Sequence, residues 1–226
     1  MLNLMNQEKK MNSNRKKSGQ FIIVSLLLLA SLLAVVFPVR TAEAKAKVDA
    51  QTFHDTMRKL WEDHITWTRL AIVSLANGLP DTDATVQRLL QNQADIGNAI
   101  KPFYGDAAGD QLTELLRQHI LIAAEIIQDA KAGNTAAEQD AITRWYANAD
   151  AIAVFLNAAN PQNWPLEDMK AMMREHLDLT LKEAVDYLGG DYPASVADYE
   201  QVHLEILKMA DMLSDGIIKQ FPQKFT

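Results

Sequence analysis

Apolar residues three and four positions apart recur from residue 51 to the end of the chain, and no stretch alternates at a spacing of two. Such spacing places apolar side chains on one face of an α-helix, whereas a half-buried strand requires alternation. Segments rich in Gly, Pro and Asn interrupt the pattern at 78–80, 104–106, 133–134, 160–161 and 189–191. Because these residues end helices, the pattern predicts an all-α fold of six helices.

The expected helices have similar lengths, from the first at about 51–77 to the last at about 193–220. Helices of about 22 residues joined by loops of about five residues must pack antiparallel, as helical hairpins. The run Leu-Leu-Arg-Gln-His-Ile at 115–120 is echoed by Met-Met-Arg-Glu-His-Leu at 172–177. A duplicated hairpin or merely a shared helical pattern explains this echo, and we favour duplication. Residues 47–226 are therefore expected to form an antiparallel six-helix bundle of three hairpins.

Residues 1–46 have the pattern of a secretory signal peptide. Five basic residues and one acidic residue precede an uncharged apolar run at 21–39, and small residues follow at Ala42, Ala44 and Ala46. A run of about 19 apolar residues is also long enough to cross a bilayer once, so a retained signal anchor is the alternative. In either case the domain is expected to be secreted or extracytoplasmic, with membrane contact only through this segment if it is retained.

The domain that follows this segment is strongly acidic. Residues 1–46 hold seven of the 22 basic and two of the 29 acidic residues, which leaves 15 basic and 27 acidic residues and a net charge of −12. Nucleic acid and anionic lipid would be repelled by such a domain, so we expect no nucleic-acid partner. The chain has no Cys, which excludes disulfides and a lipid-modified Cys.

Six polar residues fall on the expected inward faces, one on each helix. They are separated by 28, 27, 29, 28 and 27 residues, and the midpoint of every interval falls in an expected loop. Residues equidistant from the turn of an antiparallel hairpin lie at the same height, so the spacing predicts one polar layer halfway along the bundle. The six residues are His64, Asn92, His119, Asn148, His176 and His203.

A buried polar layer has two explanations. An imidazole or amide removed from water costs about 1–3 kcal/mol unless it finds a partner. Mutual hydrogen bonds would satisfy these groups and would fix the helix register, as buried Asn does in coiled coils. Alternatively, neutral imidazoles bind a transition metal ion such as Zn or Cu, or a small polar ligand. A ring of six helices is too wide for all six side chains to meet, so a ligand would contact a subset.

Acidic residues near the layer bear on this choice. A carboxylate there can orient an imidazole or act as a ligand itself, whereas ion pairing with an arginine is the structural alternative. The candidate acids are Asp95, Asp150, Glu125 and Glu183, and the arginines available to them are Arg69, Arg88, Arg117, Arg144 and Arg174.

The sequence contains no motif of a known enzyme class. It lacks a Gly-rich phosphate loop, a Gly-x-Ser-x-Gly turn and a His-Glu-x-x-His zinc helix. The Glu-x-x-His pair of di-iron bundles occurs once, at Glu200 and His203, although such a site needs two. The methionines at 169–173 and 209–212 are candidate copper ligands, but helical spacing favours a core role. A histidine beside an acid can still transfer protons, which keeps an uncharacterised hydrolase as a third alternative.

Four segments, 60–69, 95–105, 144–150 and 215–222, resemble an exported all-helical family of Gram-positive bacteria, and the resemblance extends over nearly all of residues 55–225. The clearest runs are Leu-Trp-Glu-Asp-His at 60–64 and Arg-Trp-Tyr-Ala-Asn-Ala-Asp at 144–150. The resemblance implies an exported helical fold without an assigned activity. Members are sometimes labelled acetylglutamate kinase or glycosyltransferase, but both activities belong to α/β folds with nucleotide-binding loops, and we expect neither label to apply.

These observations favour a non-enzymatic extracytoplasmic protein that binds a metal ion or a small polar ligand at the mid-bundle layer. A structural or partner-binding module of the cell envelope, in which the layer only sets the helix register, is the alternative.

Overall fold

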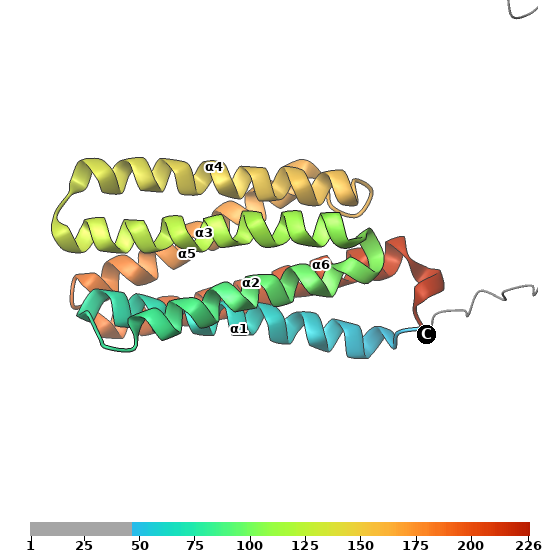
Figure 1. The fold of residues 1–226 in the computed structure, drawn as a ribbon, viewed down its shortest axis with the longest axis horizontal. Coiled ribbons are helices and arrows are strands. Elements are labelled where there is room, and N and C mark those ends of the chain that lie inside the picture. Colours follow the sequence, from blue (N-terminus) through green and yellow to red (C-terminus); the bar gives the residue numbers. More distant parts are fainter. Residues whose placement is uncertain (1–46) are drawn as a thin grey trace, which may run out of the picture. The chain divides into compact units, whose positions relative to one another are not determined.

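The computed structural model describes residues 47–226, which form six α-helices along one long axis (Figure 1). The helices are α1 (Ala50–Asn77), α2 (Thr82–Tyr104), α3 (Asp106–Ala132), α4 (Thr135–Ala159), α5 (Leu166–Leu188) and α6 (Tyr192–Gln220), followed by the short 3₁₀ helix η1 (Pro222–Lys224). The prediction of six helices is confirmed, and the first and last helices begin one residue earlier than expected. No strand forms within residues 47–226, apart from an isolated bridge between Val48 and Phe225.

Local sequence explains where the helices begin and end. Asp49 caps α1 by accepting a hydrogen bond from the backbone N–H of Thr52 at 2.7 Å, which satisfies a donor that has no partner inside the helix. Gly78 and Gly133 end α1 and α3 with positive φ angles of 62° and 67°. Glycine adopts this left-handed conformation without a steric cost, so both helices stop where the sequence breakers stand.

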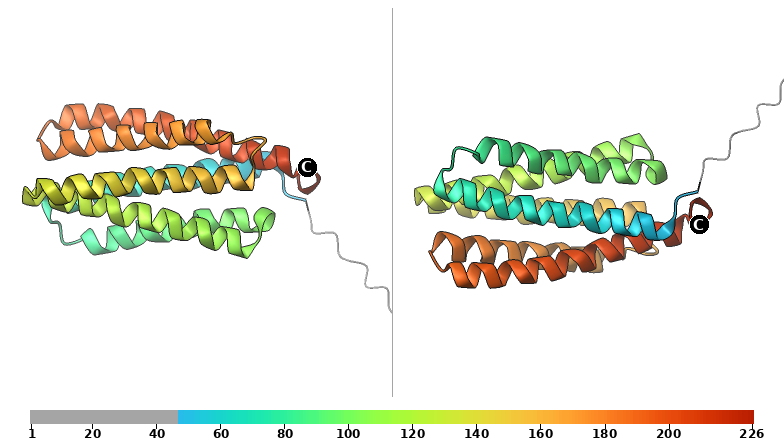
Figure 2. Two further views of the ribbon diagram at one scale, coloured as in Figure 1. Left: turned by 90° about the horizontal axis from the view of Figure 1, so that it is seen from above. Right: turned by 90° about the horizontal axis from the view of Figure 1, so that it is seen from below.

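The helices are arranged so that α1 contacts most of the others. It packs against α2, α3 and α6, while α4 lies between α3 and α5, and α5 pairs with α6. The ribbon reverses direction at each loop (Figure 1), and the views in Figure 2 place α5 and α6 on one side and α2 on the other. The loops after α1, α3 and α5 gather at one end of the bundle, and the loops after α2 and α4 gather at the opposite end. The first end is here called the cavity end, because residues that line a small apolar cavity, among them Leu75 and Ile127, lie toward it.

Apolar packing is continuous in most of the bundle but divided near the cavity end. A single cluster includes Met57, Ile96, Ile152, Met169 and Ile206, all of which are at most 1 % exposed. Two smaller clusters lie apart from it: one contains Ala71, Leu89, Leu90 and Ile120, and the other contains Ile72, Ile127 and Ala184. The methionines at 169, 172, 173 and 209 are core residues, as their helical spacing indicated.

Aromatic residues and the C-terminal segment close the end of the bundle opposite the cavity end. The Val48 N–H donates to the Lys224 carbonyl at 2.9 Å, and the Thr226 N–H donates to the Val48 carbonyl at 3.0 Å. Phe225 stacks on Phe103, with ring centroids 5.2 Å apart. The C-terminal segment is thereby held against the residue that leads into α1.

Close contact between α6 and the loop before α5 depends on a glycine. Trp164 is 2 % exposed, and its indole N–H donates to the Met212 carbonyl at 3.3 Å. A Cβ atom added at Gly216 would lie 2.1 Å from the Trp164 Nε1 atom. Only a residue without a side chain therefore fits beneath this indole.

The expected signal peptide or signal anchor at residues 1–46, including the apolar run at 21–39, lies outside the described residues. Within residues 47–226, no helix combines the length and the hydrophobicity that a membrane crossing requires.

Candidate functional site

Three of the four candidate histidines lie together inside the bundle. His64 on α1, His119 on α3 and His176 on α5 are 3 %, 3 % and 4 % exposed. The His64 and His176 ring centroids are 5.7 Å apart. The three rings form a cluster, here called the histidine layer, to which every second helix contributes one imidazole.

Two tryptophans pack against the histidine layer. The Trp145 ring stacks on the His119 ring with centroids 5.0 Å apart, and the Trp61 ring meets the His64 ring edge-on at 5.7 Å. These indoles exclude water from the imidazoles because both are themselves buried. The layer is therefore a polar cluster in apolar surroundings.

Asn148 on α4 fixes the orientation and tautomer of His119. The Asn148 Oδ1 atom lies 2.9 Å from His119 Nδ1, and the Asn148 side-chain amide also donates to the Leu115 carbonyl at 3.1 Å. An amide oxygen can only accept, so the His119 Nδ1 atom carries the proton. The Nε2 atom of His119 is then an acceptor with a free lone pair.

Glu205 on α6 holds His176 in the same way. The Glu205 Oε2 atom lies 2.9 Å from His176 Nδ1, and both side chains are at most 6 % exposed. The carboxylate accepts a hydrogen bond from Nδ1 and thereby fixes the orientation of the ring. Glu205 was not among the residues predicted from the sequence.

Gln93 on α2 is the residue that corresponds to Asn148 and Glu205 for His64. This pair is here called open, because no hydrogen bond joins the two side chains. The Gln93 side chain lies close enough to favour the protonated form of His64, yet the two side chains do not form a hydrogen bond. The Gln93 amide instead donates to the Leu89 carbonyl at 2.8 Å and to Asn92 Oδ1 at 3.1 Å. Within residues 47–226, the buried His64 Nδ1 and Gln93 Oε1 atoms therefore have no hydrogen-bond partner.

The three pairs share one sequence spacing that the initial prediction overlooked. Asn148 follows His119 by 29 residues, Glu205 follows His176 by 29, and Gln93 follows His64 by 29. Each pair joins the two helices of one hairpin. A search for polar residues at this fixed spacing would have found Gln93 and Glu205.

Burial keeps two of the imidazoles neutral. It lowers the pKa of His64 well below its usual value of 6.5, and repulsion from His176 and His119 lowers it further. Burial, followed by repulsion from His176, lowers the pKa of His119 to about 3, although the hydrogen bond with Asn148 acts in the opposite direction. At neutral pH both rings are uncharged hydrogen-bonding groups.

His203 does not join the histidine layer, contrary to the prediction that it points inward. Its side chain is 31 % exposed, its Nε2 atom lies 2.9 Å from Glu62 Oε1, and its ring stacks on Tyr199. Glu205 lies two residues further along α6, which turns it about 200° around the helix axis from His203. The two side chains therefore point in nearly opposite directions, and it is Glu205 that faces the core.

Asn92, also expected in the layer, is fully buried beside it. Its amide donates to the Leu60 carbonyl at 3.0 Å, and its oxygen accepts from Gln93. Asn92 thus links α2 to the backbone of α1 without contacting an imidazole through a hydrogen bond. Its role in the layer is to hold Gln93 in place.

The four candidate acids pair with arginines, as the structural alternative proposed. The shortest N–O distances are 3.8 Å for Arg88–Asp95, 2.6 Å for Arg144–Glu125, 2.8 Å for Arg174–Asp150 and 2.9 Å for Arg69–Glu183.

Glu183 is the only buried member of these four acids, at 1 % exposure. Burial raises its pKa, while the hydrogen bond and charge of Arg69 oppose that shift. Arg69 also donates to Ser195 Oγ at 2.5 Å, and Ser195 donates to the Glu183 carbonyl at 3.0 Å. This network joins α1, α5 and α6, and its ionic groups neutralise one another.

No group of three or more His, Asp or Glu side chains in the described part of the chain is arranged to hold a metal ion. Comparison with protein-family models, curated proteins and solved structures gives no match for this chain. The chemistry available at the layer therefore follows from its geometry. The layer offers two neutral imidazoles, His64 and His119, together with an amide oxygen and an imidazole nitrogen that have no partners, and buried indoles surround it.

Proposed function

We propose that this chain is a non-enzymatic extracytoplasmic protein that binds a small polar ligand at the histidine layer. The open pair of His64 and Gln93 is the observation that carries the proposal. The equivalent pairs, His119 with Asn148 and His176 with Glu205, are closed by hydrogen bonds of 2.9 Å.

An open polar pair in a core is costly without a ligand. Each unpartnered buried polar atom costs about 1–3 kcal/mol, so an apolar residue at position 64 would favour stability. A hydroxyl group both donates and accepts, and it can satisfy His64 Nδ1 and Gln93 Oε1 together. The ligand is expected to be neutral, because the nearby imidazoles of His64 and His119 are uncharged at neutral pH.

A metal ion is a less well supported ligand. Carboxylate and amide groups that hold Nδ1, as Glu205 and Asn148 do, commonly support metal-binding imidazoles from behind. However, the side chains of residues 47–226 present no group of three ligands at suitable positions. Metal analysis is therefore included in the test as a competing outcome.

A purely structural layer is the second candidate, and the two closed pairs favour it. They link α3 to α4 and α5 to α6 at one height, and buried polar pairs of this kind specify helix register. The repeated spacing of 29 residues in all three hairpins also supports descent from one duplicated hairpin. Under this candidate, His64 and Gln93 are remnants of a third structural pair.

The extracytoplasmic location rests on the sequence pattern of residues 1–46 and on the resemblance to an exported helical family. An acidic domain outside the cytoplasm whose core holds the uncharged imidazoles of His64 and His119 suits capture of a small neutral molecule. The domain is expected to be either secreted or tethered by residues 21–39.

The test compares the untagged full chain with His64→Leu and with the control His203→Gln, which changes a histidine at the surface. Native mass spectrometry of protein from the producing cells is expected to show a small adduct in the unaltered chain and in the control. The adduct should be absent from His64→Leu, whose free energy of unfolding should be equal or higher because an unpartnered polar group is removed.

Two results would overturn the proposal. Stoichiometric metal, lost on replacing His119 or His176, would establish a metal site instead. A His64→Leu variant that is clearly destabilised, together with no adduct in any form, would establish the structural layer.

A further inference from the structure

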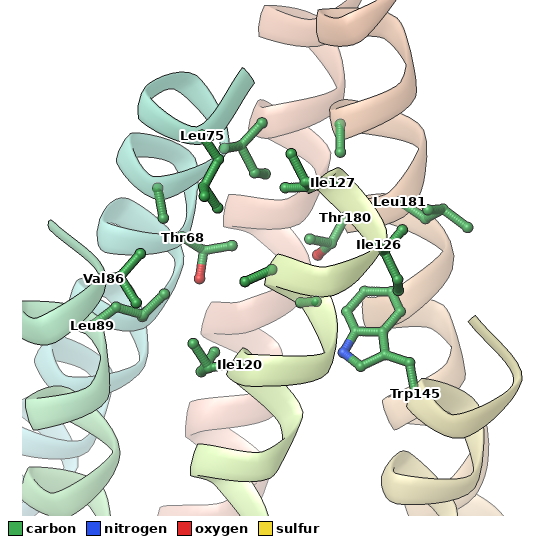
Figure 3. A pocket seen from close by; sticks show the side chains of 15 residues that line it. Thr68, Leu75, Val86, Leu89, Ile120, Ile126, Ile127, Trp145, Thr180 and Leu181 are labelled. Atoms are coloured by element: carbon green, nitrogen blue, oxygen red, sulfur yellow. The ribbon is translucent and has the colours of Figure 1, made fainter. Parts of the chain in front are cut away.

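A small apolar cavity lies between α1, α2, α3 and α5 near the cavity end (Figure 3). Its volume is about 40 Å³, and no charged side chain of the described residues lines it. The apolar packing is divided here, because the buried cluster around Leu89 and the buried cluster around Ile127 are separate, although both contribute residues to the cavity lining. An aliphatic group placed in the cavity would contact both clusters.

The cavity is continuous with two hollows on the surface of the domain. Leu75 at the end of α1, Val86 on α2 and Ala124 on α3 line the cavity and also line a hollow between α2 and α3. Leu75 lines a second hollow beside the loop after α1 as well. The two hollows also share Thr82 and Gln128, and they are together called the groove. The cavity is therefore an inward extension of the groove, past side chains that are only half-buried.

A pair of glycines explains why the groove lies at this end of the α2–α3 hairpin. Near the turn at the other end, the two helices approach closely, because a Cβ atom added at Gly97 would lie 2.5 Å from the Gly109 carbonyl oxygen. Toward the cavity end, Val86, Gln87 and Gln128 face the space between the helices. The distance between two helices depends on the side chains at their contact. The hairpin is thus narrow near its turn and open at the groove.

The size of the cavity indicates that its occupant is one aliphatic side chain of a larger partner. One water molecule needs about 10–15 Å³, and a dry cavity of about 150 Å³ holds benzene, so a space of about 40 Å³ takes only a few non-hydrogen atoms. A free molecule of that size has few atoms with which to bind. A side chain that enters from the groove adds the contacts of its own backbone and neighbours, as anchor residues at interfaces do.

The groove has the polar rim that a peptide segment requires. Gln87 on α2 and Gln128 on α3 line it and are exposed, and their amides can pair with the N–H and C=O groups of a peptide backbone. Asp83 on α2 and Glu125 on α3 add carboxylates to the lining. Glu125 already pairs with Arg144 at 2.6 Å, so Asp83 is the acid to consider for a partner.

The charges around the groove favour a basic segment. The domain as a whole is strongly acidic. Lys131, the one basic residue among the described residues that line the groove, donates to a backbone carbonyl of α1 at 3.2 Å. Arg88, the basic residue nearest to Asp83 along α2, pairs with Asp63 and Asp95. The Asp83 carboxylate, exposed in the first turn of α2, is therefore available to a Lys or Arg side chain of a partner.

We propose that the groove docks a segment of a partner protein in which a branched aliphatic side chain enters the cavity and a neighbouring Lys or Arg side chain reaches Asp83. The same segment would cover Leu121, which lines the groove and is 46 % exposed. This is a second site, and it does not rest on the ligand proposed for the histidine layer.

The test uses short synthetic peptides and the full chain. The probe is the acetylated peptide amide Gly-Ala-Leu-Lys-Ala-Gly, and two matched controls replace its Leu by Ala or its Lys by Glu. Binding is followed by nuclear magnetic resonance of isotope-labelled methyl groups. The probe is expected to cause saturable shifts at the cavity residues Val86, Ile120 and Ile127. The peptide without Leu should leave these resonances in place, and the peptide with Glu should bind about fivefold more weakly.

Variants of the chain locate the site. Ala184→Leu extends a side chain of the cavity lining and should abolish the cavity shifts, whereas Ala171→Leu, at an exposed position of the same helix, should retain them. Asp83→Asn should weaken binding of the probe by about threefold. Asp106→Asn changes the equivalent acid in the first turn of α3, at the other end of the bundle, and should have no effect. Both aspartates are exposed, so neither change is expected to disturb folding.

The proposal is overturned if the probe leaves the cavity methyl groups in place, if the shifts persist in Ala184→Leu, or if the peptide with Glu binds as well as the probe. A dilution series without peptide is the remaining control. Dimerisation that shifts the same methyl groups would assign the groove to a second copy of this chain and would also overturn the proposal. The adduct test on His64→Leu reports on the histidine layer separately, so a groove that binds no peptide leaves that proposal standing.

Discussion

Acid should destabilise this protein well above the pH at which carboxylates titrate. His64 and His119 are neutral in the folded state, because burial lowers the pKa of His119 to about 3 and that of His64 well below 6.5. Both rings are free to bind a proton near pH 6.5 once the chain unfolds. The unfolded state therefore binds more protons below pH 6.5, and the free energy of unfolding falls as the pH falls.

The size of this loss follows from linkage. One histidine with an unfolded pKa of 6.5 and a folded pKa far below 5 costs about 2 kcal/mol of stability between pH 7 and pH 5. His64 and His119 together are expected to cost about 4 kcal/mol, a large share of the roughly 5–15 kcal/mol of a typical domain. The raised pKa of Glu183 acts in the opposite direction, because the folded state then binds a proton that the unfolded chain binds only at lower pH. This contribution is common to the unaltered chain and to His119→Gln, so the comparison of the two isolates the histidine.

The assay is urea unfolding followed by far-ultraviolet circular dichroism at pH 7, 6 and 5. His119→Gln cannot be protonated, so its loss of stability between pH 7 and pH 5 should be about 2 kcal/mol smaller than that of the unaltered chain. His203→Gln, which alters a partly exposed ring, should show the full loss. A free energy of unfolding that stays level down to pH 5, or an equal loss in His119→Gln, would refute the assignment of buried neutral imidazoles.

Three further changes test the packing around the site. Gly216→Ala places a methyl group against the Trp164 indole and should lower the free energy of unfolding by about 1–3 kcal/mol; a thermal melt matching the unaltered chain would contradict the close contact. Glu205→Ala leaves His176 unpartnered and should cost about 1–3 kcal/mol in urea unfolding, whereas Glu205→Gln should keep the hydrogen bond and most of the stability. Thr180→Val removes an unpartnered hydroxyl and should leave stability equal or raise it, so a lowered melting temperature would reveal a partner for that group.

The helices could be predicted from sequence because their signals are local. Asp49, Gly78 and Gly133 act within one turn of their own positions, so the spacing of apolar residues and breakers placed the first helix to within one residue. The order in which the helices pack against one another is not determined by local sequence, and only the structure shows it. A sequence pattern shows which face of a helix is buried but not which neighbour covers it.

The sequence predicted only some members of the polar layer, and the reason is geometric. Equal distance from a turn fixes the height of a residue in a hairpin but not its direction around the helix axis. His119 and Asn148 satisfied both conditions, whereas His203 shared the height but faced outward. Glu205, two residues away, was overlooked because one polar residue was assigned to each helix and His203 already represented the last one. The acids Asp95, Asp150 and Glu125 pair with arginines, whereas Glu205 pairs with His176.

The bridge between Val48 and Phe225 makes the backbone of this domain nearly a closed circle. A short peptide linker could join these two positions, and new chain ends could be opened at Gly105, between α2 and α3, without separating any of the three hairpins that carry a layer pair. Such a rearranged chain should still fold. Because Val48 and Phe225 lie side by side, the domain also suits insertion into a surface loop of a host protein, whose chain would enter and leave the domain at adjacent positions.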